Sequence, residues 1–326
     1  MKKKEPFALH KISKKYRALG TVIELTLFGT QSKELLDEAF ALIQYYEELL
    51  TVNRETSELM AINLSAGLEA VQVSAPVYQL IKLAIQKSQE HFGFNAAIGP
   101  LVKLWHIGFL DAKLPAEKEI QKQLVLSNPD HILLKDETFS VFLPQKGMEL
   151  DLGGIAKGYI ADRIQDLWHA KGYERGIINL GGNLILMGDP PHHSDGQWRV
   201  GIRNPLDNSR QSIVQIIAGE GSVVTSGISE RYLNVGGKKY HHIIDPETGY
   251  PHDNRIASVT VFSRKSIDGE IETTRLFFAD KPQEKWLLEG RGGYGALYVT
   301  RDRKIIAVGI PRNQIKILDE RFTLIW

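Results

Sequence analysis

The sequence predicts an α+β fold, and two observations carry that prediction. Residues 1–172 contain long segments with the apolar spacing of amphipathic helices, whereas residues 173–326 consist mostly of short apolar runs separated by Gly, Pro, Asn and Asp. Strands do not alternate regularly with helices, as they would in a doubly wound parallel sheet. No repeat, low-complexity tract or long linker is visible, so we expect one domain over residues 1–326.

The first half begins with a strand over residues 21–28, where apolar and polar residues alternate, followed by a helix over about 32–50. The clearest helix comes next, with Ser74 as the expected cap, Pro76 in the first turn and Gly93 just past the end. These signals fix both ends of that helix.

The stretch 94–109 mixes Gly, Pro and aromatic residues and fits neither period, so we expect a structured loop. A short helix over 115–124, a hairpin-like region over 131–143 and a helix after Asp151 that ends by Gly172 are expected next. The second half should hold one helix near 273–278 and the strands GIINL, NLILMG, WRVGIR, SIVQIIAG, SVVTSG, YHHIID, ASVTVF, GALYV and KIIAVG.

Composition excludes several classes of function. Lys plus Arg number 40 against 39 Asp plus Glu, a net charge of +1, so no global field favours nucleic acid or anionic membrane. The absence of Cys excludes a thiolate nucleophile, a disulfide framework and Cys-ligated zinc. The basic N-terminus is not followed by an apolar segment, and no transmembrane segment is visible. We expect a cytoplasmic protein as given, or an exported or membrane-anchored one if an N-terminal signal was removed.

Three Gly-rich clusters could bind a ligand. In DLGGIAKGY, residues 151–159, a turn precedes a helix, which suits either an anion site or a plain helix entry, but the Walker A spacing is absent. NLGGNLILMG, residues 179–188, has double Gly typical of a bulge or tight turn. YHHIIDPETGYP, residues 240–251, contains a good turn, and His242 within it could be a hydrogen-bonded core histidine.

The cluster DGEIETT, residues 268–274, has two readings. Acidic residues and hydroxyls are typical of a solvated first turn of a helix. They are also ligands that Mg²⁺ accepts, and the local pattern leaves both readings open. A metal site built on His192, His193 and Asp195 is disfavoured because PPHHSDG reads as an exposed loop.

Together, and in this order, these motifs resemble the ApbE family of FAD-dependent FMN transferases. The resemblance runs over nearly the whole chain, and its most specific parts are DLGGIAKGY and HIIDPETGYP. It implies a T-fold-like ApbE architecture with antiparallel sheets packed against helices. It also implies Mg²⁺ as cofactor, FAD as substrate, and a flavoprotein acceptor that presents a Thr or Ser hydroxyl.

The resemblance also implies a role for individual residues of this chain. Those implied at the flavin nucleotide are Leu19, Asn53, Phe94, Asn95, Asp151, Lys157, Ile244 and Thr273. Those implied at the metal are the Gly154 carbonyl, Glu270 and Thr274, with Asp268 as a substitute. His242 is a candidate base or organiser of the acceptor hydroxyl, with a pKa suited to neutral pH; a structural role is the alternative.

Two positions depart from the family pattern. Glu270 stands where the family has the shorter Asp, which moves the carboxylate by about one C–C bond, and Asp268 could then take its place. Asn53 stands where many members have an aromatic residue, so a stacking wall for the nucleotide is missing. FMN transfer with AMP release is therefore the leading expectation, and the alternatives are FAD hydrolysis to FMN and AMP, or flavin binding without turnover.

Overall fold

A computed structural model of the chain describes residues 10–207, 209, 211–279 and 292–325. Its centre is a nine-stranded sheet in which every pairing is antiparallel except that of the last two strands. In spatial order the strands are β1 (Lys11–Ala18), β2 (Thr21–Phe28), β6 (Gly176–Leu180), β7 (Leu184–Met187), β10 (Gly221–Gly227), β13 (Ile256–Ser263), β14 (Gly293–Thr300), β15 (Lys304–Val308) and β17 (Thr323–Ile325).

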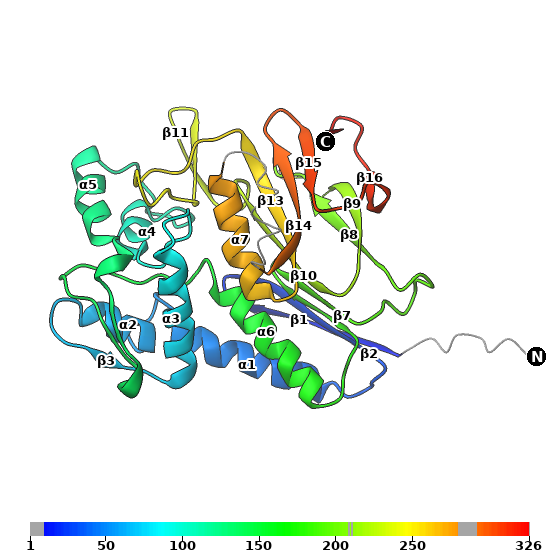
Figure 1. Cartoon of the computed structure of the whole chain (residues 1–326), viewed down its shortest axis with the longest axis horizontal. Helices are drawn as coiled ribbons and strands as arrows, with labels where there is room; N and C mark the ends of the chain where they lie inside the picture. Colours follow the sequence, from blue (N-terminus) through cyan, green and yellow to red (C-terminus); the bar gives the residue numbers. More distant parts are fainter. Residues whose placement is uncertain (1–9, 208, 210, 280–291, 326) are drawn as a thin grey trace, which may run out of the picture.

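One face of this sheet is covered by three helices (Figure 1), which are α1 (Glu34–Leu50), α6 (Ala156–Ala170) and α7 (Ser266–Phe278). Their apolar sides share a core with the inward residues of the strands, such as Leu25, Ile178 and Ile185. The other face packs against a small sheet of β8 (Trp198–Arg203), β9 (Ser212–Ala218) and β16 (Ile315–Ile317). Helices, large sheet and small sheet therefore form three layers.

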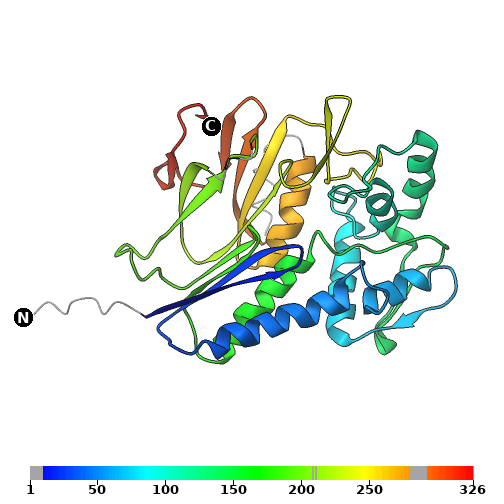
Figure 2. The same cartoon turned by 180° about the vertical axis from the view of Figure 1, so that it is seen from behind.

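A lobe of helices lies beside these layers, as Figures 1 and 2 show from opposite sides. It contains α2 (Glu58–Leu64), α3 (Ala75–Ser88), α4 (Gly99–Trp105), α5 (Glu117–Leu126) and a three-stranded sheet of β3 (Val71–Gln72), β4 (Leu133–Lys135) and β5 (Ser140–Phe142). Leu59 and Tyr78 of the lobe belong to the same apolar core as α1 and α6. A separate hairpin of β11 (Tyr232–Val235) and β12 (Lys238–His241) stands next to the lobe.

The α+β prediction is confirmed. Ser74 is the N-cap residue of α3, as expected, although its hydroxyl donates to Glu58 Oε2 at 2.9 Å and makes no capping bond. Three local expectations are wrong. Helix α3 ends at Ser88, well before Gly93, whose missing side chain leaves room for Phe278: a Cβ there would lie 2.6 Å from its ring. The stretch 94–109 contains α4, because Leu101 and Trp105 pack in an apolar cluster with Ile120 of α5.

The third error concerns α7, which begins at Ser266 and not near Thr273. Its start is fixed by tertiary contact, since the carboxylate of Asp162 on α6 accepts hydrogen bonds from the backbone N–H groups of Ser266 (2.7 Å) and Ile267 (3.0 Å). The segment expected as a solvated first turn is therefore the buried middle of a helix. Strands β1 and β11 were not expected, because Lys and Arg interrupt the apolar alternation in β1 and β11 is short and largely exposed.

Candidate functional site

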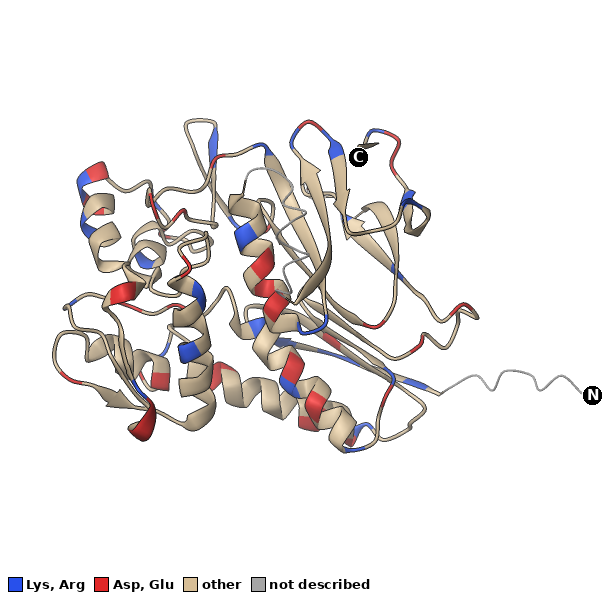
Figure 3. Ribbon diagram, viewed as in Figure 1, with Lys and Arg blue, Asp and Glu red and all other residues tan. Residues whose placement is uncertain are grey.

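The site is organised around the contact of α6 with α7. Gly158 makes this contact possible: a Cβ on it would lie 2.6 Å from the Ser266 carbonyl oxygen and 2.7 Å from Glu270 Cγ. Figure 3 shows the acidic residues of α7 along the helix beside α6. The last Gly of DLGGIAKGY is thus needed for helix packing, which brings the two predicted motifs together.

Glu270 is the central acidic group of the site and is only 6% exposed. Burial raises the pKa of its carboxyl, while the charge of Lys157 and a hydrogen bond from Asn183 Nδ2 to Oε1 (2.8 Å) oppose that rise. Oε2 accepts no hydrogen bond from the part of the chain that the structure describes. A buried carboxylate with one free oxygen beside a lysine is suited to bind a cation.

Thr274 lies one turn after Glu270 on the same side of α7, is half-buried, and donates to the Glu270 carbonyl at 3.2 Å. Thr273 is fully buried and accepts a hydrogen bond from Ser226 Oγ at 2.9 Å. Its own hydroxyl donates to the Glu270 carbonyl at 3.0 Å. The Thr273 side chain thus holds α7 against β10 and has no exposed surface, and its contact with the nucleotide stays a prediction.

Asp268 points away from Glu270. Residues two apart on a helix differ by about 200° around its axis. Asp268 lies against Gly292, where an added Cβ would collide with its carboxylate, and burial raises its pKa while the charges of Lys265 and Lys87 lower it. The two carboxylates thus have different neighbours, and Asp268 does not substitute for Glu270 at one metal site.

The turn before α6 forms a second wall of the site. Asp151 Oδ1 accepts a hydrogen bond from the Gly153 N–H at 2.7 Å, and its backbone N–H donates to the Ala96 carbonyl at 2.9 Å. Burial raises the pKa of Asp151, opposed by that Gly153 hydrogen bond and the Arg231 charge. Gly154 is exposed, and a Cβ on it would meet only the Phe94 ring, at 3.6 Å. Its backbone is therefore open to a ligand.

Two predicted nucleotide contacts can act only through their main chains. The Asn95 side chain is already used, since its Nδ2 donates to the Ser127 carbonyl at 2.8 Å and its Oδ1 accepts from the Ala97 N–H at 2.8 Å. Ile244 is buried in the cluster of Leu101 and Trp105. Neither side chain is free to contact a ligand.

His242 follows directly after β12 and is held by one carbonyl. Its backbone N–H donates to the Arg231 carbonyl at 3.2 Å, and its Nδ1 lies 3.2 Å from the same oxygen. Because a carbonyl only accepts, Nδ1 carries the proton and Nε2 of the neutral ring is an acceptor. Burial lowers the pKa of His242 to about 4, assisted by the Arg231 and Lys157 charges. The expected near-neutral pKa is therefore wrong, and the ring is neutral at physiological pH.

Arg231 is a site residue that the sequence reasoning missed, as are Asn183 and Ser226. Its guanidinium lies beside the β1–β2 turn, 3.3 Å from a Cβ added at Gly20. No ion pair or side-chain hydrogen bond holds this guanidinium within the described ranges. The available signal was the position of these residues in INLGGN and TSGISER, beside motifs already singled out.

The remaining expected residues lie at the margin of the site. Leu19 has a positive φ of 52° in the β1–β2 turn, and its N–H donates to Glu47 Oε1 at 2.8 Å. Asn53 is exposed in the loop between α1 and α2, and its backbone N–H donates to Thr51 Oγ1 at 3.1 Å. The Asn53 side chain makes no hydrogen bond to the described residues.

The described part of the chain lacks both a cluster of metal-binding side chains and a membrane-spanning helix. It contains no group of three or more His, Asp or Glu side chains placed to hold a metal, so a cation here would depend on hydroxyl and carbonyl oxygens as well. None of its helices combines the length and the apolar character needed to cross a membrane. The loop of His192, His193 and Asp195 is exposed, as expected.

Comparison with known proteins points to one family. A profile described as the ApbE family matches residues 19–298. The chain is 44% identical over 308 residues to an FAD:protein FMN transferase of Klebsiella pneumoniae, covering 94% of this chain and 95% of that protein. It is 33% identical over 322 residues to one of Treponema pallidum, covering 94% and 89%.

Solved structures agree as well. The crystal structure of the ApbE protein from Thermotoga maritima superposes with a TM-score of 0.81 at 26% identity, covering 95% of this chain and 97% of that one. The flavin transferase ApbE from Vibrio cholerae superposes with a TM-score of 0.77, covering 96% and 98%, and supports the fold. The profile match over residues 19–298 and the relatives of 44% and 33% identity show that the chain belongs to the ApbE family.

Proposed function

We propose that this protein is an FAD:protein FMN transferase, which cleaves FAD at its pyrophosphate and passes FMN to a hydroxyl of an acceptor protein. The observation that carries the proposal is the buried Glu270 carboxylate, with one free oxygen, beside Lys157 and against Gly158, four residues after the open Gly154 backbone. Breaking a pyrophosphate depends on positioning and on neutralising charge that develops on phosphoryl oxygens. This arrangement supplies both.

The residues fit Mg²⁺, which prefers a few oxygen ligands and keeps waters for substrate phosphates. Glu270 Oε2, the Thr274 hydroxyl and the Gly154 carbonyl would hold the ion, which when bound neutralises phosphoryl charge. Thr274 now donates only to a helix carbonyl, at 3.2 Å, so its lone pairs remain available. Lys157 would bind the pyrophosphate from the other side.

FAD would lie between the helical lobe and the sheet. Phe94, which lies against Gly154, would form one wall, and Leu19 with Arg231, which lies beside Gly20, would form the other. The free Arg231 guanidinium is suited to an anionic or carbonyl oxygen of the ligand, since it has five N–H donors in a fixed plane. Asp151 holds the Gly153–Gly154 turn open by its hydrogen bond to the Gly153 N–H.

In the transfer step, the oxygen of an acceptor Thr or Ser hydroxyl attacks the FMN phosphorus, and the bond from that phosphorus to the oxygen bridging AMP breaks. His242 Nε2 accepts the hydroxyl proton, and AMP leaves as a phosphate monoester. The Arg231 carbonyl keeps Nδ1 protonated, which fixes Nε2 as the acceptor. His242 thus positions the hydroxyl and receives its proton.

The test is to incubate the protein with FAD, Mg²⁺ and a candidate acceptor, to quantify AMP, and to weigh the acceptor for an FMN adduct. AMP together with an adduct supports the transferase. AMP without an adduct supports the second candidate, Mg²⁺-dependent FAD hydrolysis, which the exposed Asn53 favours because water can reach the site more easily there. FAD binding without AMP would leave flavin binding alone, and the absence of binding would overturn all three.

A further inference from the structure

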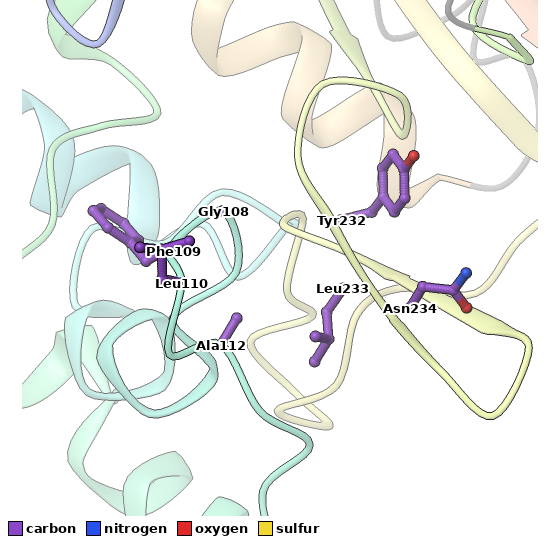
Figure 4. A pocket seen from close by; sticks show the side chains of 7 residues that line it. All are labelled: Gly108, Phe109, Leu110, Ala112, Tyr232, Leu233 and Asn234. Carbon is purple, nitrogen blue, oxygen red and sulfur yellow. The ribbon is translucent and has the colours of Figure 1, made fainter.

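A groove beside the site is not used by the FAD chemistry above. It has a volume of about 490 Å³ and lies between a loop after α4 and the β11 strand (Figure 4). We name it the hairpin groove and define it by its lining residues, which are Gly108, Phe109, Leu110, Ala112, Tyr232, Leu233 and Asn234.

Several exposed apolar side chains lie along the hairpin groove and its rim. Phe109, Leu110 and Leu114 are exposed on the loop, with Leu110 fully so, and Tyr232 and Val235 are exposed on the hairpin. Single exposed apolar residues need no explanation, but a cluster that lines a groove indicates a binding surface. The chemistry of the occupant must therefore include apolar side chains.

The outer edge of β11 offers backbone hydrogen bonds to that occupant. The β11–β12 sheet has two strands, joined by Gly236 and Gly237 with φ of 59° and 81°, so Val235 and Lys238 close a two-residue turn. In such a hairpin the N–H and C=O groups of alternate residues point outward. Those of Tyr232 and Asn234 face the outer edge, and within the described ranges no backbone group pairs with them.

The β11 edge begins next to Arg231, the residue that contacts His242. Arg231 immediately precedes β11, and its carbonyl holds His242. Its Cδ also lies 2.9 Å from a Cβ added at Gly108, so the same side chain borders the hairpin groove. A segment paired with β11 would lie one strand away from His242, and it would reach Nε2 by continuing past Arg231.

The hairpin is also positively charged. Lys239 Nζ lies 4.6 Å from the centre of the Tyr232 ring, and Lys238 Nζ lies 5.3 Å from that of Tyr240. Both lysines are exposed, and no carboxylate pairs with either among the described residues. An acidic segment would complement this charge.

We propose that the hairpin groove docks the acceptor protein as an extended segment, which pairs with the β11 edge and places an apolar side chain between Phe109 and Leu233. Acidic residues of the segment face the two lysines, and its Thr or Ser reaches His242. This inference rests on the proposed transferase function and adds the mode by which the acceptor is recognised, which is strand addition.

The first test uses twelve-residue peptides as acceptors, each with one Thr and a Leu two residues before it, because alternate side chains share one face of a strand. One set has Asp flanks and a matched set has Lys flanks. We expect FMN transfer to the Asp peptides to exceed transfer to the Lys peptides by about tenfold in kcat/KM. Equal transfer to both sets, or transfer to neither while AMP is still released from FAD, would overturn the docking mode.

The second test compares two substitutions at one position of the hairpin. Asn234→Pro removes an outward N–H from the β11 edge, whereas Asn234→Ala, the matched control, keeps that N–H and removes only the side chain. We expect Asn234→Pro to raise KM for the Asp peptide about tenfold or more, while Asn234→Ala raises it by less than threefold. FAD affinity, measured by quenching of flavin fluorescence, should be unchanged in both.

The third test addresses the apolar part of the groove. Leu110→Ser should raise KM for the same peptide about tenfold, whereas Leu68→Ser, at an exposed leucine after α2, should leave it unchanged. Weaker FAD binding by Leu110→Ser would assign the groove to FAD and overturn the proposal.

A dimer in the wild type that Asn234→Pro dissociates, with unchanged transfer, would assign the edge to a second copy and also overturn the proposal. If the wild type binds no FAD, the transferase function itself fails, a result distinct from all of these.

Discussion

The α6–α7 contact and the hairpin groove lie next to each other but are built on opposite principles. In the contact, Gly158 lets two helices touch and Glu270 is buried with a defined partner on Asn183. In the groove, Leu110 and Tyr232 are exposed and the backbone of Asn234 is unpaired in the described chain. The difference teaches that the groups proposed to act on FAD are fixed by packing, while the surface proposed for the acceptor is left open for a partner to complete.

The largest expected effect is on the buried side of this comparison. Glu270→Gln keeps the size of the side chain and an oxygen for Asn183 but removes the charge, so we expect AMP release to fall about 100- to 1,000-fold. Thr274→Ala should cause a loss of similar order. Asp268→Asn is the control and should retain near wild-type AMP release, measured by chromatography. A dead Asp268 variant with an active Glu270 variant would move the metal site to the other face of α7.

His242→Gln should lower the transfer rate about 100-fold while leaving FAD affinity unchanged, because a proton acceptor is lost. Since the pKa of His242 is lowered to about 4, Nε2 should stop accepting a proton only near pH 4. Burial raises the pKa of Glu270, so protonation of that carboxylate lowers the rate of both proteins on acidification. The ratio of the wild-type to the variant rate isolates His242, and it should stay level from pH 8 to about 5 and fall near pH 4. An inflection near pH 6.5 would contradict a buried neutral ring.

His242 and its neighbour His241 both affect how stability depends on pH. The pKa of His241, like that of His242, is lowered to about 4, and burial is the largest cause. A histidine whose pKa is lowered in the folded state contributes stability that is complete above the unfolded value of about 6.5 and is lost as the pH falls through about 4. We expect the melting temperature to decrease over that window, and His242→Gln to make the decrease smaller. A melting temperature that rises on acidification would contradict the assignment.

Gly158→Ala should destabilise the protein by about 1–3 kcal/mol, because the added methyl would meet the Ser266 carbonyl at 2.6 Å. Urea unfolding measures the loss, and AMP release should decrease as Glu270 is displaced. Gly154→Ala is the matched control within the same motif, since its Cβ would meet only Phe94, at 3.6 Å. It should leave stability within about 0.5 kcal/mol of wild type. An equal loss from both would show that the motif is structural throughout.

The smallest expected effect is at the exposed margin. Asn53→Tyr adds an aromatic face, worth on the order of 0.5–1.5 kcal/mol beyond area burial if it stacks on FAD. We expect FAD binding to tighten several-fold and the ratio of free FMN to FMN adduct to fall. An unchanged ratio would show that Asn53 does not control access of water to the site.

Much of the fold was predictable from local pattern. Periodicity placed α1, α5, α6 and most of the long strands, because their apolar residues repeat at the spacing of the element they form. The motifs DLGGIAKGY and HIIDPETGYP were sufficient to indicate the family. These motifs indicated which side chains the site contains, but not which of those side chains lie together in the folded protein.

Only the tertiary structure decided three matters, each for a physical reason that lies outside the local sequence. The start of α7 depends on Asp162, a residue about a hundred positions earlier, so no local cap could reveal it. The choice between Glu270 and Asp268 depends on which side of α7 meets α6. The neutral state of His242 depends on burial and on two cations from distant segments, because a pKa is set by surroundings that the chain assembles only on folding.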